Sequence, residues 1–186
     1  MNSIGQKVYQ RVAFGGGCFW CTEAVFLGLK GVVNVTSGYA GGTVPNPTYE
    51  QVSTGATGHA EVILVVYDPQ IISYEKLLEI FFESHDPTSL NRQGDDIGTQ
   101  YRSIILFTVP DQRAAAERFV NELADARVYD KPLVTEIAPL EAFYPAEEYH
   151  KNYYACHLNE GYSRAVIKPK IEKIRKKYQE LLVVKP

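Results

Sequence analysis

The stretch GGGCFWC, residues 15–21, places two thiols three positions apart directly after a run of glycines. Apolar residues before it predict a strand and those after it predict a helix, so Cys18 should lie at or next to the helix N-terminus. Unpaired N–H groups and the helix dipole favour an anion there, and such sites lower a thiol pKa from about 8.5 to roughly 3.5–7.5. Cys18 is therefore a candidate nucleophile. The alternative is a small buried apolar side chain beside a glycine turn.

Cys21 completes a CxxC spacing that suits several kinds of site. Zinc needs about four ligands, and the chain adds only Cys156 and four histidines without paired spacing, so we expect no metal. A thioredoxin-like dithiol fits CxxC at a helix start, although Phe19 and Trp20 are an unusual intervening pair. These two aromatics are either core residues or the walls of a small apolar pocket. A reactive thiol with a redox role fits best.

Two long polar segments carry groups that could assist a thiol. The first, residues 40–59, contains Tyr49 and His59 and leads into a strand at Glu61. Desolvation at an apolar pocket disfavours a charged carboxylate, so Glu61 could stay protonated and donate a proton; a solvated charge is the alternative. A lone histidine in either segment is more often structural than catalytic. The second segment, residues 85–102, supplies further polar side chains: His85, Asp86, Arg92, Asp95, Asp96 and Tyr101.

The elements that must bring these groups together follow the order β-α-β-β-α-β. Hydrophobic patterning predicts strands at 8–14, 32–39, 60–67 and 103–109, and helices at 19–29 and 73–83, with Ser73 as an N-cap. A helix over 111–126, a strand near 133–138 and two short C-terminal helices complete the chain. This order matches the ferredoxin-like split βαβ unit, an α/β (α+β) two-layer sandwich, here with long coil loops and a C-terminal extension. Right-handed crossovers would place the cysteine turn and both long segments at one edge of the sheet.

Composition limits the classes of protein. A chain of 186 residues, 45% hydrophobic and 22% charged, fits one globular domain over residues 1–186. A net charge of −3 argues against nucleic acid as a partner, and the basic stretch at 168–182 is more simply a solvated helix face. The N-terminus lacks the apolar core of a signal peptide, and no apolar run reaches membrane-spanning length. We therefore expect a cytoplasmic monomer with reduced thiols and no membrane partner.

Four stretches resemble the MsrA-type peptide methionine sulfoxide reductases: GGGCFWCTE, GYAGG…NPTYEQVSTGATGHAE, ISYEKLLEIFFESHDPTSLNRQGDDIGTQYRS and FYPAEEYHKNYY. They occur in order and span most of the chain, so the match is highly specific. The resemblance implies a ferredoxin-like fold and a peptide-methionine (S)-S-oxide reductase, an oxidoreductase that repairs oxidised methionine in peptides and proteins. It implies no cofactor, with thioredoxin or a small dithiol as the reductant.

The resemblance also implies roles by position. Cys18 is similar to the nucleophile whose thiolate attacks the sulfoxide sulfur, and Glu61 to the acid that protonates the oxygen. Cys18 would become a sulfenic acid, which a second thiol converts to a disulfide that thioredoxin reduces. The substrate would be contacted by Phe19 and Trp20 around its ε-methyl group and by Tyr49, Asp96 and Tyr101 around its oxygen.

The identity of the second thiol stays open. In many members of the family the resolving cysteine follows a tyrosine near the C-terminus, but here GYSRAVIKPK has Ser163 at that place. Cys156 lies seven residues earlier, and Cys21 occupies a position that is often glycine. Cys21 is slightly favoured, because it lies one helical turn from Cys18 on the same face. Two other classes remain from the residues alone: a thiol–disulfide oxidoreductase that uses the CxxC pair directly, and a non-catalytic module that binds oxidised methionine.

Overall fold

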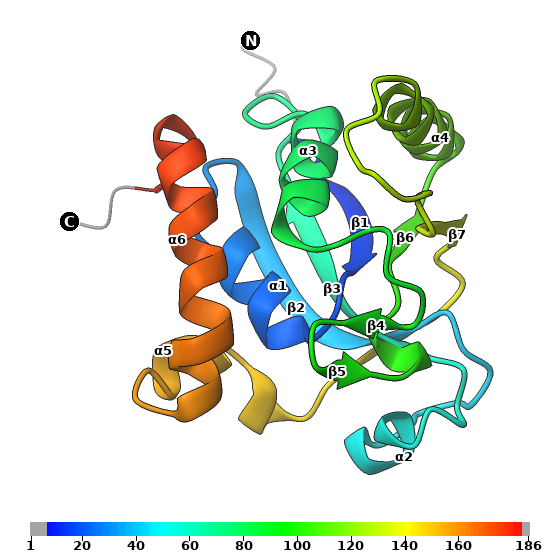
Figure 1. Ribbon diagram of the computed structural model, residues 1–186, viewed down its shortest axis with the longest axis vertical. Helices are drawn as coiled ribbons and strands as arrows, with labels where there is room; N and C mark the ends of the chain where they lie inside the picture. Colours follow the sequence, from blue (N-terminus) through cyan, green and yellow to red (C-terminus); the bar gives the residue numbers. More distant parts are fainter. Residues whose placement is uncertain (1–6, 184–186) are drawn as a thin grey trace, which may run out of the picture.

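The centre of the molecule is a six-stranded sheet with the strand order β7-β6-β1-β3-β2-β8. The structure, a computed structural model, describes residues 7–183 (Figure 1). Neighbouring strands run antiparallel except β6 and β7, which are parallel. Residues 1–6, in which the sequence shows no signal-peptide core, lie outside the described part of the chain. The strands are β1 Gln10–Gly15, β2 Val32–Ala40, β3 Ala60–Tyr67, β6 Ile104–Phe107, β7 Glu136–Pro139 and β8 Phe143–Pro145.

Four of these strands lie side by side in the order β6-β1-β3-β2. They correspond to the strands that the sequence predicts at 103–109, 8–14, 60–67 and 32–39. Both β1 and β2 run antiparallel to β3, and β6 runs antiparallel to β1. At one edge Ala60 pairs with Ala40, and Ile104 pairs with Gly15. The cysteine turn and both long segments therefore leave or enter the sheet at this edge, as predicted.

The larger helices lie on the same face of the sheet (Figure 1). Ser73 caps α3, since its side chain accepts a hydrogen bond from the Lys76 N–H at 3.1 Å, as predicted. Helix α1 ends at Phe26, before the predicted end at 29, because the chain turns through Gly28 into β2. These helices are α1 Phe19–Phe26, α3 Tyr74–Ser84, α4 Pro110–Asp125 and α6 Lys168–Lys177.

The two faces of the sheet are packed differently. Under the helices lies the main core, which includes Phe14, Phe26 and Phe81. The opposite face carries a small cluster of mostly short side chains, such as Ala13 and Ala60, covered by residues between β7 and β8. Because β3 is buried on both faces, its sequence AEVILVVY is an almost continuous apolar run.

The two long segments contain short elements that hydrophobic patterning does not predict. Residues 40–59 include α2, Tyr49–Ser53, which begins with a capping box formed by Thr48 and Gln51. Residues 85–102 include a hairpin of β4, Arg92–Gln93, and β5, Asp96–Ile97, followed by a 3₁₀ turn at Thr99–Tyr101. Among residues 7–183, no helix has the length and apolar character needed to cross a membrane.

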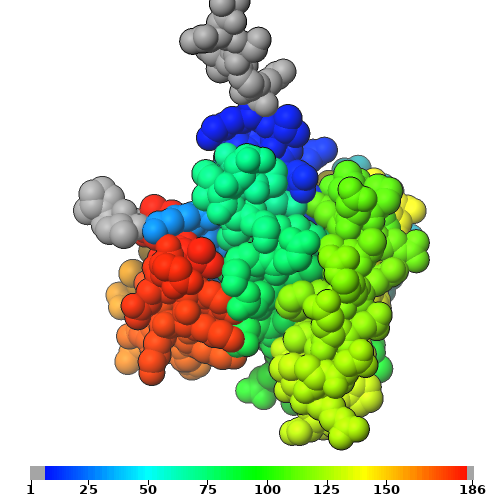
Figure 2. Space-filling view, turned by 90° about the horizontal axis from the view of Figure 1, so that it is seen from above, coloured from blue at the N-terminus to red at the C-terminus, as the bar shows by residue number. Residues whose placement is uncertain are grey.

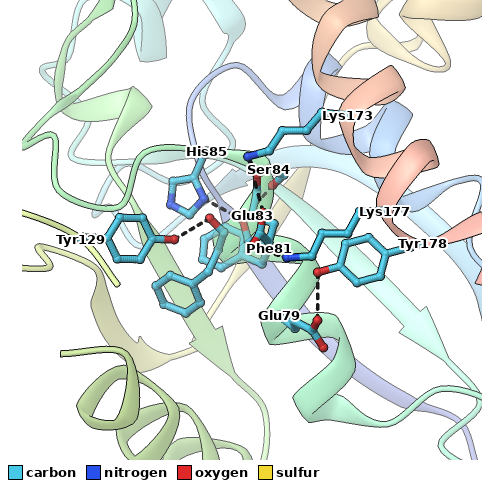
Figure 3. A network of polar contacts seen from close by, with 10 residues as sticks. Glu79, Phe81, Glu83, Ser84, His85, Tyr129, Lys173, Lys177 and Tyr178 are labelled. Carbon is cyan, nitrogen blue, oxygen red and sulfur yellow. Dashed lines mark hydrogen bonds and ion pairs between the residues drawn. The ribbon is translucent and has the colours of Figure 1, made fainter. Parts of the chain in front are cut away.

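The C-terminal stretch returns across the helical face. Helix α6 lies beside α3, on the opposite side from α4 (Figure 2). Two of its lysines contact Glu83, with Lys173 Nζ donating to the Glu83 carbonyl at 2.8 Å and Lys177 Nζ to its carboxylate at 2.6 Å (Figure 3). Ile171 and Ile174 are buried beneath them. The basic stretch is thus a packed amphipathic helix, preceded by α5, Tyr153–Cys156, and by a π-helical turn at Ser163–Ile167.

Candidate active site

Cys18 is the N-cap residue of α1, as the glycine-cysteine sequence predicts. Gly17, just before it, has a φ of +91°, a conformation that side chains rarely adopt, and a Cβ there would lie 2.7 Å from Gln93 Cγ. The glycine therefore allows the tight turn that places Cys18 at the N-cap of α1. Only 7% of Cys18 is exposed.

The carboxyl group of Glu61 lies against the same helix end. Its Oε2 accepts a hydrogen bond from the Phe19 N–H at 3.1 Å, and the residue is 2% exposed. Burial raises the pKa of Glu61 to about 8, although the Phe19 hydrogen bond opposes the shift. Glu61 is therefore a carboxylic acid that stays neutral at pH 7 next to the candidate nucleophile, rather than a solvated charge.

Three further predicted residues converge on Cys18 and Glu61 from separate short elements. Tyr49 comes from α2, Asp96 from β5 and Tyr101 from the 3₁₀ turn. The pKa values of both tyrosines are raised, first by burial and then by the nearby charge of Glu61, with Cys18 also contributing. The structure thus brings the predicted polar residues together around one thiol.

The two cysteines of the CxxC pair differ in acidity. Burial raises the pKa of the Cys18 thiol well above its ordinary value, and its hydrogen bond with Cys21 and the charge of Glu61 act in the same direction. The prediction of a lowered Cys18 pKa is therefore wrong, because desolvation outweighs the helix N-terminus. The pKa of Cys21 is lowered, mainly by the hydrogen bond from Cys18 and against the effect of burial. Cys21 is the more acidic thiol of the pair.

Phe19 and Trp20 form an aromatic wall beside the thiol. Phe19 is buried, with its ring centroid 5.0 Å from His150 and 5.9 Å from Tyr39. Trp20 is partly exposed, and Tyr153 stacks on its indole at 3.6 Å between centroids and 5° between planes. One face of the indole is therefore covered by a tyrosine from α5.

Comparison with known proteins decides the family. A family model described as peptide methionine sulfoxide reductase matches residues 10–182. The peptide methionine sulfoxide reductase MsrA of Polynucleobacter asymbioticus is 50% identical over 185 residues, covering 98% of this chain and 97% of the relative. That of Saccharolobus solfataricus is 55% identical over 166 residues, covering 89% and 93%. The chain belongs to the MsrA family of peptide methionine sulfoxide reductases.

Solved structures agree with this membership. The methionine sulfoxide reductase A of Corynebacterium diphtheriae is 38% identical with a TM-score of 0.73, over 83% of this chain and 77% of that one. Reduced Mxr1 from Saccharomyces cerevisiae is 33% identical with a TM-score of 0.75, over 82% and 87%. The chain is therefore an MsrA enzyme with the MsrA fold: a mixed, curled six-stranded sheet and six helices.

Sequence reasoning missed a group of residues beside this cluster that lie between β8 and the π-helical turn. His150 is 1% exposed, and its Nδ1 accepts the Trp20 Nε1–H at 3.0 Å. Glu147 accepts the Tyr39 hydroxyl at 2.8 Å and the Tyr49 N–H at 2.9 Å, so it holds the start of α2. The stretch FYPAEEYHKNYY carries a signal in its density of aromatic and acidic residues, but no periodicity indicates where each side chain points.

The remaining predicted groups lie outside this cluster. Cys156 is the last residue of α5 and is exposed. His59 bonds the Gly42 N–H and the Val44 carbonyl within its own segment, so it is structural. Burial lowers the pKa of His85 to about 4, and its ring nitrogens contact the Phe81 carbonyl and Ser103 (Figure 3 shows the first contact).

Proposed function

We propose that this MsrA enzyme reduces the S epimer of methionine sulfoxide, free or within peptides and proteins, with Cys18 as nucleophile and Glu61 as general acid. One observation carries the proposal. The Phe19 N–H, directly after Cys18, donates a hydrogen bond to the Glu61 carboxyl. Burial raises the pKa of Glu61 to about 8, so the carboxyl is protonated at neutral pH. An acid poised near neutral pH beside a thiol suits proton donation to a sulfoxide oxygen.

The reaction balances within the site. The Cys18 sulfur forms a bond to the sulfoxide sulfur while Glu61 protonates the oxygen, and the carboxylate so formed can take up the Cys18 thiol proton. The oxygen then leaves with the Cys18 sulfur as a sulfenic acid, and the thioether of methionine is released. The substrate sulfur gains two electrons and the Cys18 sulfur loses two. Because the resting thiol is neutral, its proton must leave as the S–S contact forms.

The aromatic and polar residues around Cys18 would orient the substrate. We infer that Phe19 and Trp20 contact the ε-methyl group, and that Tyr49, Asp96 and Tyr101 hydrogen-bond near the oxygen. Tyr153 already stacks on one face of the Trp20 indole.

Cys21 is our candidate for the thiol that resolves the sulfenic acid. It is buried, in hydrogen-bond contact with Cys18 and more acidic than Cys18. Cys156 is exposed at the end of α5, so using it would require the C-terminal segment to rearrange. We propose thioredoxin as the reductant of the resulting disulfide. Supporting this choice, Mxr1 has been solved in complex with Trx2; that structure is 21% identical to this chain, with a TM-score of 0.55.

The finer points of architecture are also proposals. We infer one domain over residues 1–186, built on a ferredoxin-like split βαβ unit, and the strand order β6-β1-β3-β2 supports this reading. The three free cysteines suit the reducing cytoplasm, where we expect the enzyme to act as a monomer.

The direct test is dithiothreitol-driven reduction of each purified epimer of a blocked methionine sulfoxide. We expect turnover of the S epimer alone. Turnover of the R epimer at a similar rate, or binding of either epimer without turnover, would contradict the proposal. Reduction of a model disulfide that is unaffected by Glu61→Gln would instead support a thiol–disulfide oxidoreductase.

A further inference from the structure

Tyr162 is the residue of the C-terminal segment that comes closest to the sulfur chemistry. It immediately precedes the π-helical turn and has helical backbone angles, with φ −65° and ψ −43°. The next residue, Ser163, is fully buried, and Ile167 anchors the same turn in the core. The edge of the Tyr162 ring faces Trp20, with 5.9 Å between centroids. The ring is therefore packed against Trp20 and directly precedes a buried turn.

That hydroxyl meets three polar groups of the site. It donates a hydrogen bond to Asp96 Oδ2 at 2.8 Å. It also lowers the pKa of the Cys18 thiol and that of the Cys21 thiol by hydrogen bonding, so it lies next to both sulfurs. For the other site tyrosines, Tyr49 and Tyr101, the charge of Cys18 is one of the causes that raise the pKa. Tyr162 thus bridges the two sulfurs that the proposed recycling step must join.

We propose that Tyr162 is a further catalytic residue, whose hydroxyl relays a proton from Cys21 to the oxygen of the Cys18 sulfenic acid as the disulfide forms. This inference rests on the proposed function, in which Cys21 attacks Cys18. The Cys21 S–H bond breaks, the S–S bond forms and the Cys18 S–O bond breaks. The departing oxygen, which already carries one hydrogen, gains a second and leaves as water. The Cys18 sulfur is reduced by one electron and the Cys21 sulfur oxidised by one.

A hydroxyl group is suited to this relay because it donates one hydrogen and accepts another at the same atom. Burial raises the pKa of Tyr162, and the charges of Cys18 and Cys21 add to the effect, so the phenol does not give up its hydrogen without gaining one. The hydrogen from Cys21 therefore arrives as the other leaves, and the tyrosine ends unchanged. Asp96 orients the hydroxyl before the sulfenic oxygen is present.

The test begins with the unmodified enzyme and one equivalent of methionine S-sulfoxide, without reductant. Released methionine and a Cys18–Cys21 disulfide, located by peptide mapping, would establish the step on which the relay depends. No methionine release would overturn the proposed function itself. A disulfide from Cys18 to Cys156 would overturn both the choice of resolver and the relay.

The deciding variant is Tyr162→Phe, which keeps the ring against Trp20 and removes the hydroxyl. We expect methionine release within a few-fold of the parent enzyme, disulfide formation slowed about 10²-fold as for loss of a proton-transfer group, and a sulfenic acid that dimedone traps. Tyr178→Phe is the matched control, because it likewise removes one tyrosine hydroxyl, here one bonded to Glu79 at 3.0 Å (Figure 3).

Three results would overturn the relay. Disulfide formation at the parent rate in Tyr162→Phe would show that the hydroxyl takes no part. Equal slowing in Tyr162→Phe and Tyr178→Phe would show that loss of packing, and not of the relay, causes the effect. Slowing of methionine release to the same degree as disulfide formation would likewise contradict an assignment to recycling.

Discussion

The active site is built from two regions of different character. The turn at residues 15–21, together with Glu61, is held between paired strands and the N-terminus of α1, and its thiols and carboxyl are buried. The stretch 146–167 instead has a left-handed residue at Asn152, a four-residue helix and a π-helical turn. Side chains tie it to the first region, including Trp20, whose Nε1–H donates to His150 Nδ1 at 3.0 Å and whose ring stacks on Tyr153.

This difference suggests a division of labour. The rigid first region holds the nucleophile and the acid in fixed relation, as a reaction in a desolvated site requires. The second region covers the aromatic wall through Tyr153 and reaches the sulfurs through Tyr162. Changes at Cys18 and Glu61 should therefore affect reduction of the sulfoxide, and changes at Tyr153 and Tyr162 should affect binding and recycling.

The largest effect should come from Cys18→Ser. A serine hydroxyl is not ionised at neutral pH and cannot take up the sulfoxide oxygen as a sulfenic acid, so we expect turnover to be abolished. The measurement is dithiothreitol-driven reduction of methionine S-sulfoxide, with circular dichroism to confirm folding. Residual activity above about a tenth of the parent rate would mean that the chemistry does not lie in the first region.

Of the two cysteines that could resolve the sulfenic acid, Cys21 lies in the first region and Cys156 in the second. The variants Cys21→Ser and Cys156→Ser therefore form a matched pair. We expect Cys21→Ser to release one equivalent of methionine but to lose turnover with thioredoxin, because no buried thiol remains beside Cys18. Cys156→Ser should turn over normally. The reverse outcome would assign recycling to the second region. Normal turnover in both variants and in their combination would mean that thioredoxin attacks the sulfenic acid itself.

A smaller effect is expected at Trp20, where the two regions touch. Trp20→Ala removes the wall that Tyr153 covers, so KM for methionine sulfoxide should rise and the preference for the ε-methyl group should weaken. If Trp20 serves only as a core residue, the variant should lose about 3–5 kcal/mol of stability with unchanged kinetics. Thermal melting alongside kinetics at low temperature distinguishes the two outcomes.

The contrast between the regions also explains what the sequence could predict. Strong patterning along β1, β3 and α3 identified the order of strands and helices along the chain. With right-handed crossovers, this order placed Cys18, Glu61 and both long segments at one edge of the sheet. The two-residue strands β4 and β5 were missed because such short elements have no period. The Cys18 pKa was predicted in the wrong direction, since the helix N-terminus is visible in sequence but burial depends on tertiary packing. His150 and Tyr162 were missed for the same reason.

The central claim is that protonated Glu61 drives reduction at Cys18, and the pH dependence of a single turnover tests it most directly. The pKa of Glu61 is raised to about 8, so the acid form is present at neutral pH and is lost as the pH rises through that value. Methionine release should therefore fall above about pH 8 in the parent enzyme. In Glu61→Gln it should be slower by roughly 10²–10⁴-fold at pH 7, with that falling limb absent. A Glu61→Gln rate within a few-fold of the parent at pH 7, or an unchanged falling limb, would contradict the account.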